Sequence, residues 1–155
     1  KMTVAYGKAF RMRVLGCDKL PFEIDGVEPV DFDTLLAESD AISIHIHLLR
    51  ENVHLFNEQA FAKMKDGAVL VNTARGNLID EAALVDALDA GHIGAAGLDC
   101  FVTEPGGNPA FASYDNVMMM PHVGSATVQT RDAMGFKALD NLDAFFRGES
   151  PPNAL

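Results

Sequence analysis

The stretch AVLVNTARGNLIDEAALVDALDAG, residues 68–91, decides the fold that the sequence predicts. Its first part, residues 68–71, is a short apolar run bounded by polar residues, which is typical of an interior strand of a parallel sheet. Asp80 then predicts a helix N-cap, and a helix follows over residues 81–90 until Gly91 ends it. A strand followed directly by a helix is the unit from which parallel sheets are built.

The same alternation of strands and helices continues along the whole chain. Strands are predicted over residues 12–17, 28–30, 41–47, 68–71, 94–100 and 116–120, and helices over residues 3–10, 31–39, 58–65, 81–90 and 127–147. This pattern predicts an α/β fold, a Rossmann-like parallel sheet flanked by helices, with right-handed crossovers. The length of 155 residues predicts one domain.

Composition excludes several classes of partner. The net charge is −10, so we expect no nucleic acid and no anionic membrane surface as a partner. Apolar residues make up 48% of the chain, but no apolar run approaches the roughly 18 residues that a membrane helix needs. With only two cysteines and no signal peptide, we expect no disulfide framework and a cytoplasmic location.

Parallel sheets bind ligands beyond the carboxyl ends of their strands, so the candidate site residues are those that follow each predicted strand. These residues are Asp18, His45 to His47, Asn72 to Gly76, Asp99 to Glu104, and His122 to Thr127.

Two charged residues in this set suit anionic or hydroxyl-bearing ligands. Asp18 can accept hydrogen bonds from ribose hydroxyls and repel a 2′-phosphate, which favours NAD over NADP, or it can cap a turn. Arg75 follows a buried strand, where an unpaired charge is costly. It therefore points into solvent, pairs with a structural acid, or grips a carboxylate with two hydrogen bonds and polarises a neighbouring carbonyl.

Three further residues suit proton transfer. A histidine side chain in general titrates near neutral pH, so His122, in MPHVGSAT, can carry the proton that accompanies hydride transfer, or it is a structural histidine. Glu104, in FVTEP, can orient that imidazole and favour its charged form, or it is a surface acid. Asp99 can fix a carboxamide or cap its loop, and Gly124 allows close approach of a ligand.

Two other patterns are weaker. His45 and His47 alternate on one strand face, a spacing that can hold a metal, but no cysteine or further histidine is near in sequence, so we predict no metal. The glycines of GHIGAAG, residues 91–97, precede a strand instead of following one, which is the wrong context for a phosphate loop.

Three stretches, LVNTARGNLIDEAALVDAL, GLDCFVTEP and MPHVGSAT, resemble the signature segments of the D-isomer-specific 2-hydroxyacid dehydrogenase family. Their order and the separations of 29 residues between Arg75 and Glu104 and 18 between Glu104 and His122 are similar to those of the family. The likeness extends from the helix before MRVLGCD to PPN. It implies NAD as cofactor and hydride transfer between NAD(H) and a small 2-hydroxy or 2-oxo acid.

The resemblance also implies residue roles. His122 would exchange a proton with the substrate, Glu104 would be its partner, and Arg75 would bind and polarise the 2-oxo acid. The implied cofactor-binding residues are Asp18, His45, Thr73, Ala74, Arg75, Asp99, His122 and Gly124. One departure is His47-Leu48-Leu49, where the family usually has a proline followed by Leu and Thr.

Family members also have a substrate domain, a first central strand and a glycine-rich phosphate loop, and we expect these before Lys1. The 155 residues contain no GxGxxG. We therefore expect residues 1–155 to be a partial, truncated dinucleotide-binding domain with weak or absent NAD binding, inactive alone and without the substrate domain. The alternative is an inactive remnant that serves as a dimerising or binding module.

The expected missing strand lies between the strands predicted over residues 12–17 and 41–47, so their backbone groups would face a gap. Each buried unpaired group costs roughly 1–3 kcal/mol. We expect the chain to shift its sheet, to lose the first strand from the sheet, or to associate with another chain, as a homodimer does.

Overall fold

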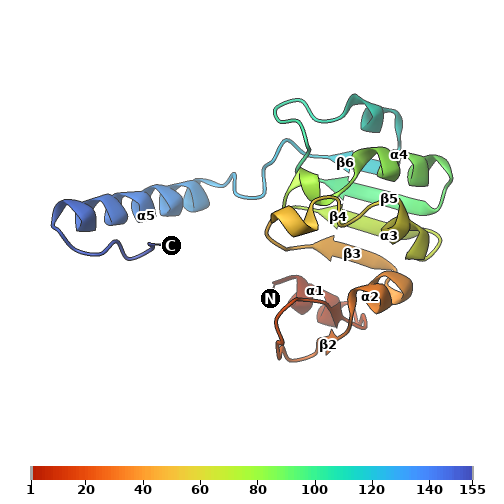
Figure 1. The fold of residues 1–155 in the computed structure, drawn as a ribbon, viewed down its shortest axis with the longest axis horizontal. Helices are drawn as coiled ribbons and strands as arrows, with labels where there is room; N and C mark the ends of the chain where they lie inside the picture. Colours follow the sequence, from red (N-terminus) through yellow and green to blue (C-terminus); the bar gives the residue numbers. More distant parts are fainter. Residues whose placement is uncertain (1, 155) are drawn as a thin grey trace. The chain divides into compact units, whose positions relative to one another are not determined.

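The computed structural model describes residues 2–154, which form an α/β fold (Figure 1). The elements are α1 (Met2–Ala9), β1 (Leu15–Gly16), β2 (Glu28–Pro29), α2 (Phe32–Glu38), β3 (Ala41–Ile44), α3 (Glu58–Lys63), β4 (Ala68–Asn72), α4 (Glu81–Asp89), β5 (Ile93–Leu98), β6 (Val117–Met119) and α5 (Val128–Phe146), with short 3₁₀ helices η1 (Arg50–Asn52), η2 (Gly76–Leu78) and η3 (Pro109–Ser113). Two compact units result, residues 1–121 and 122–155.

The main sheet contains four parallel strands in the order β3-β4-β5-β6, as Figure 1 shows. The order along the sheet follows the order along the chain, with α3 between β3 and β4 and α4 between β4 and β5. The predicted parallel sheet flanked by helices is therefore confirmed.

The hydrophobic core lies between this sheet and the helices α3 and α4. Leu70 of β4 and Ile93 of β5 are fully buried, and they belong to one cluster with Phe61 of α3 and Leu84 of α4. Alternate residues of β4 are buried and half-buried, as expected for side chains that point to opposite faces of a strand. The core thus fixes the sheet whose carboxyl edge carries the candidate site residues.

Side-chain caps, among them the predicted cap at Asp80, explain where four of the helices begin. The side chains of Asp31, Asn57, Asp80 and Thr127 each accept a hydrogen bond from a backbone N–H group in the first turn of the helix that follows. These bonds satisfy donors that have no partner within the helix. Gly91, with φ 70°, follows α4 in the left-handed conformation that glycine adopts without strain.

The strand β1 does not join the main sheet. It spans Leu15–Gly16, shorter than the predicted 12–17, because it pairs only with the two residues of β2. Among the described residues β1 pairs with β2 and β3 pairs with β4, so β1 lies outside the main sheet.

Arg13 adds an ion-pair network next to this small two-stranded sheet. Its guanidinium group donates to both carboxylate oxygens of Glu28 at 2.8 Å and to Glu38 at 2.6 Å. The hydrogen bonds from Arg13 lower the pKa of the Glu28 carboxyl. All three side chains are about half exposed, so the network contributes little to stability.

The strands of the main sheet end on one row of paired residues. Ile44 of β3 pairs with Asn72 of β4, and Asn72 also pairs with Leu98 of β5. Beyond this row no partner strand continues, so β3 ends three residues and β5 two residues before their predicted ends at residues 47 and 100. His45, Thr73 and Asp99 therefore follow directly at the same edge of the sheet.

The helix α5 begins and ends close to the predicted residues 127 and 147. Ala144 is its one buried residue, whereas Met134, Leu142 and Phe145, which the sequence places at helical spacing, are exposed. None of the described helices combines the length and apolar character that a membrane-spanning helix requires.

Candidate active site

The turn that carries Arg75 is organised by a buried asparagine. Asn72 is fully buried at the carboxyl end of β4. Its side-chain amide donates to the Arg75 carbonyl at 2.8 Å, and its side-chain oxygen accepts from the Ala74 N–H at 3.0 Å. These two bonds fold the backbone of residues 73–75 back over the strand end, which leaves Thr73 and Arg75 exposed.

Gly76 brings this turn against the segment that follows β5. A Cβ atom on Gly76 would lie 2.0 Å from the Phe101 carbonyl carbon and 2.4 Å from the Val102 nitrogen. Only glycine allows this approach between two backbones. The Cys100 thiol donates to the Ala74 carbonyl at 3.5 Å, which adds a second contact between the same segments. The Arg75 turn and the Cys100 segment are therefore packed together.

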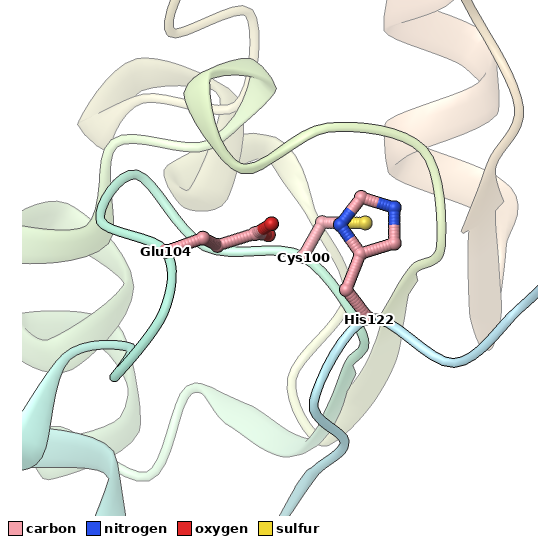
Figure 2. A group of neighbouring side chains, drawn as sticks. All are labelled: Cys100, Glu104 and His122. Carbon is pink, nitrogen blue, oxygen red and sulfur yellow. The ribbon is translucent and has the colours of Figure 1, made fainter. Parts of the chain in front are cut away.

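Glu104 and His122 lie beside Cys100, as Figure 2 shows. The Cys100 sulfur, a Glu104 carboxylate oxygen and a His122 ring nitrogen all lie within 4.8 Å of one another. In Figure 2 the Glu104 carboxylate points toward the imidazole and the sulfur. His122 is peptide-bonded to Pro121, just beyond β6, and has a φ of 53°, a backbone conformation that residues other than glycine seldom adopt.

Hydrogen bonds within the segment after β5 fix the Glu104 carboxylate. The Phe101 N–H donates to Glu104 Oε1 at 2.9 Å. Glu81, at the start of α4, accepts from the Val102 N–H at 2.8 Å and from the Asn108 side chain at 3.1 Å. Both carboxylates therefore order the loop, which positions Glu104 for its neighbours.

The charges of the candidate site act together on the Cys100 thiol. Burial raises its pKa, and the negative charges of Asp99 and Glu104 raise it further, whereas the positive charge of Arg75 lowers it. Cys100 is only 2% exposed and Asp99 only 6%. The thiol is consequently protonated at neutral pH, in agreement with its role as donor to Ala74.

The structure brings some of the predicted site residues together by direct contacts. Glu104 and His122 lie close together, and Ala74 and Arg75 belong to the turn packed against Cys100. Asp99 directly precedes Cys100. The chemical result is an imidazole and a carboxylate beside a segment that packs against the Arg75 turn, a set whose groups can transfer a proton and bind an anion.

Other predicted residues have observed local partners. Asp18 is exposed, and its Oδ1 accepts from the Leu20 N–H at 3.1 Å, so the predicted turn cap is confirmed, while its ribose role stays a prediction. His45 is exposed, with its Nε2 atom 2.9 Å from Ser43 Oγ and 3.3 Å from Thr3 Oγ1. Gly124 is also exposed.

Sequence reasoning missed Glu81, and it included Asn72 and Cys100 among the candidate residues without giving either of them a role. Asn72 has a recognisable signal, because an amide at the last position of an apolar strand must find hydrogen bonds inside the protein. Glu81 and Cys100 have none, because their contacts join segments that lie far apart along the chain.

A parallel sheet in an α/β fold, with polar residues beyond the carboxyl ends of its strands, is typical of dinucleotide-binding domains. The chain belongs to a specific family within this class. Residues 1–124 match the family of the D-isomer specific 2-hydroxyacid dehydrogenase, NAD binding domain. The predicted family and cofactor type are therefore confirmed.

Individual relatives agree with this assignment. The chain is 47% identical over 130 residues to the glyoxylate reductase of Thermococcus litoralis, covering 84% of this chain and 39% of the relative. It is 41% identical over 138 residues to the hydroxypyruvate reductase of Thermotoga maritima, covering 86% of this chain and 45% of the relative.

Solved structures of related proteins share the fold. The D-lactate dehydrogenase with NAD⁺ from Lactobacillus jensenii superposes with a TM-score of 0.91 at 31% identity, covering 99% of this chain and 51% of the other. The glyoxylate reductase from Paecilomyes thermophila gives 0.88 at 39% identity, with coverages of 94% and 46%. The chain thus spans about half the length of the proteins it matches, or less.

Proposed function

We propose that the protein carrying this chain transfers a hydride between NAD(H) and a small 2-hydroxy or 2-oxo acid. One observation carries the proposal: a Glu104 oxygen and a His122 nitrogen lie within 4.8 Å, beside a segment that packs against the Arg75 turn. An acid–histidine pair and an arginine are the groups that reduction of an anionic ketone needs.

His122 acts as the general acid in the reducing direction. Its imidazolium gives a proton to the carbonyl oxygen of the substrate as that oxygen gains charge, and it takes the proton back in oxidation. The Glu104 carboxylate stabilises the charged imidazole and holds its orientation. Its own orientation is fixed by the Phe101 N–H.

Arg75 binds the substrate carboxylate. A guanidinium group can donate two parallel hydrogen bonds to a carboxylate, which fixes the position of the adjacent carbonyl. Arg75 is exposed, and its Nη1 donates to the Ala74 carbonyl at 2.6 Å, a bond that orients the guanidinium group. The relatives named as glyoxylate and hydroxypyruvate reductases support a small 2-oxo acid as the substrate.

NAD supplies or accepts the hydride when it is bound. The residues at the carboxyl edge fit such a ligand, because Asp18 presents an exposed carboxylate after β1 and Thr73 lies exposed after β4. We assign the ribose hydroxyls to Asp18 and the nicotinamide side to Thr73, Ala74 and Asp99, and we propose His45 and Gly124 as further cofactor contacts. A carboxylate at the ribose position selects against a 2′-phosphate.

The test is NADH oxidation by the purified protein with glyoxylate, hydroxypyruvate and pyruvate. H122N and E104Q should each lower kcat by 100-fold or more, since general acid catalysis contributes roughly 10²–10⁴-fold. H47N, which changes an exposed histidine at the same sheet edge, is the matched control. Unchanged turnover in H122N would refute the proposed acid.

Binding of NADH to residues 1–155 alone is a separate question. We predict weak or absent binding and no turnover, because backbone N–H groups of a glycine-rich loop supply much of the grip on a pyrophosphate. Calorimetric titration with NADH tests this prediction. Micromolar affinity would show that the described strand ends suffice for binding.

A second candidate function is a dimerising or binding module without catalysis. The exposed apolar side chains of α5, among them Met134, Leu142 and Phe145, support it, and we propose that the chain forms a homodimer. A monomer by light scattering at high concentration would contradict the homodimer. We also propose one dinucleotide-binding domain over residues 1–155 and, from the two free cysteines, a cytoplasmic location.

A further inference from the structure

The group formed by Cys100, Glu104 and His122 offers a metal ion one sulfur, one oxygen and one nitrogen ligand. The three ligand atoms lie within 4.8 Å of one another (Figure 2). Metal–ligand bonds of 2.0–2.3 Å in a tetrahedron would place the ligand atoms about 3.5 Å apart. The ligand atoms would therefore approach one another by at most roughly 1.3 Å to surround a metal ion.

The two ligands other than the thiol are accessible to a cation. Glu104 and His122 are exposed, whereas Cys100 is buried. The bond from the Phe101 N–H engages Glu104 Oε1, but a carboxylate has about four lone-pair sites and can accept more than one partner. The Glu104 carboxylate can thus bind a cation and keep its bond to the Phe101 N–H.

We propose that Cys100, Glu104 and His122 form a site for a borderline-soft divalent cation of the Zn²⁺ class. A mixed sulfur, nitrogen and oxygen set suits Zn²⁺ and Cd²⁺, whereas Mg²⁺ and Ca²⁺ take oxygen ligands. Three protein ligands leave a fourth position open for water. When the cation binds, the thiol loses its proton to solvent and a metal–thiolate bond forms.

The cation would act as a reversible inhibitor, a consequence that rests on the proposed function. A His122 nitrogen that coordinates a metal cannot transfer a proton, and a coordinated Glu104 no longer stabilises the imidazolium. The Cys100 thiol gives the site a sulfur ligand, so thiophilic metals should bind to it.

The test is titration of the purified, metal-free protein with Cd²⁺ while the ultraviolet charge-transfer absorption of a cadmium–thiolate bond is recorded. We expect one equivalent of Cd²⁺ to produce this band in the wild-type protein and in C17S. The band should be lost in C100A. Cys17 is the matched control, because it is the other free thiol of the described chain and does not belong to the cluster.

Two further variants keep the proposal testable if C100A does not fold, as circular dichroism would reveal. E104A and H122A change exposed residues, and each should weaken Cd²⁺ binding at least tenfold. Three outcomes would each overturn the proposal. The first is loss of the band in C17S with its retention in C100A, the second is unchanged Cd²⁺ affinity in E104A and H122A, and the third is the lack of a band in the wild type. The readout is independent of NADH turnover, so failure of the proposed enzyme activity would be seen separately.

Discussion

Gly76 lies directly against the Phe101 backbone, so a Cβ atom at Gly76 would approach the Phe101 carbonyl carbon to 2.0 Å and its oxygen to 2.3 Å. Both groups are main chain and cannot move aside by rotating a side chain. The Arg75 turn and the loop that carries Glu104 therefore depend on glycine for their packing.

Replacing Gly76 should destabilise the protein and separate these two segments. We expect G76A to lower the free energy of unfolding by about 3 kcal/mol, the upper range of overpacking, as measured by urea denaturation. The control is G135A, since nothing lies within 4 Å of a Cβ at Gly135 in α5. That variant should be about 0.5–1 kcal/mol more stable than wild type. A G76A protein as stable as wild type would contradict the observed packing.

Asn72 should be similarly sensitive, although for a different reason. N72L keeps the branched shape and the number of heavy atoms of the buried side chain but removes its bonds to the Ala74 N–H and the Arg75 carbonyl. The loss should lower the free energy of unfolding by roughly 2 kcal/mol, because partly buried backbone groups lose their partners. N153A, at an exposed position, should stay within about 0.5 kcal/mol of wild type in the same urea titrations. If N72L and N153A had equal free energies of unfolding, the two side-chain bonds of Asn72 would not stabilise the turn.

Much of the fold could be predicted because its signals are local. Asp80 and Thr127 cap their helices by hydrogen bonds that span two or three residues, and the apolar run at residues 68–71 forms the predicted strand. Strand ends were less predictable. The run over residues 41–47 continues as a strand only to Ile44, because its partner β4 ends at Asn72.

The candidate site was predicted in part. The sequence identified the side chains that carry proton-transfer chemistry, such as Glu104 and His122, and the structure places these two together. It did not identify the groups that hold them, because the bonds of Glu81 to Val102 and the approach of Gly76 to Phe101 depend on tertiary packing. Such contacts leave no local pattern.

A substitution of Arg75 can test whether the substrate carboxylate is bound by two directed hydrogen bonds or by positive charge alone. R75K keeps the positive charge but loses the two-pronged hydrogen bond to a carboxylate. We expect kcat/KM for glyoxylate to fall by roughly 10–100-fold, which corresponds to the 1.5–3 kcal/mol of a charged hydrogen bond. The corresponding control is R131K, which changes an exposed arginine of α5, and steady-state kinetics should show no change. If R75K retains full kcat/KM, a bidentate contact is excluded.

His92 should give the stability of the protein a pH-dependent component. Its Nε2 lies 2.8 Å from the Phe61 carbonyl oxygen, and its Nδ1 lies 2.5 Å from Asp66 Oδ1. Both nitrogens face acceptors, so the protonated ring, which has two donors, fits best. The Phe61 carbonyl and then the Asp66 carboxylate raise the pKa of His92 above its usual value of 6.5.

A raised pKa in the folded state stabilises the protein fully below the unfolded value and is lost as pH rises through the folded value. We therefore expect the difference in unfolding free energy between wild type and H92N to be largest below about pH 6.5 and to shrink as pH rises above it. Urea denaturation from about pH 5.5 to 8.5 measures this difference. D66N should reduce its pH-dependent part, because it removes the negative acceptor. A difference that stays constant across this range would show that the two contacts do not favour the charged ring.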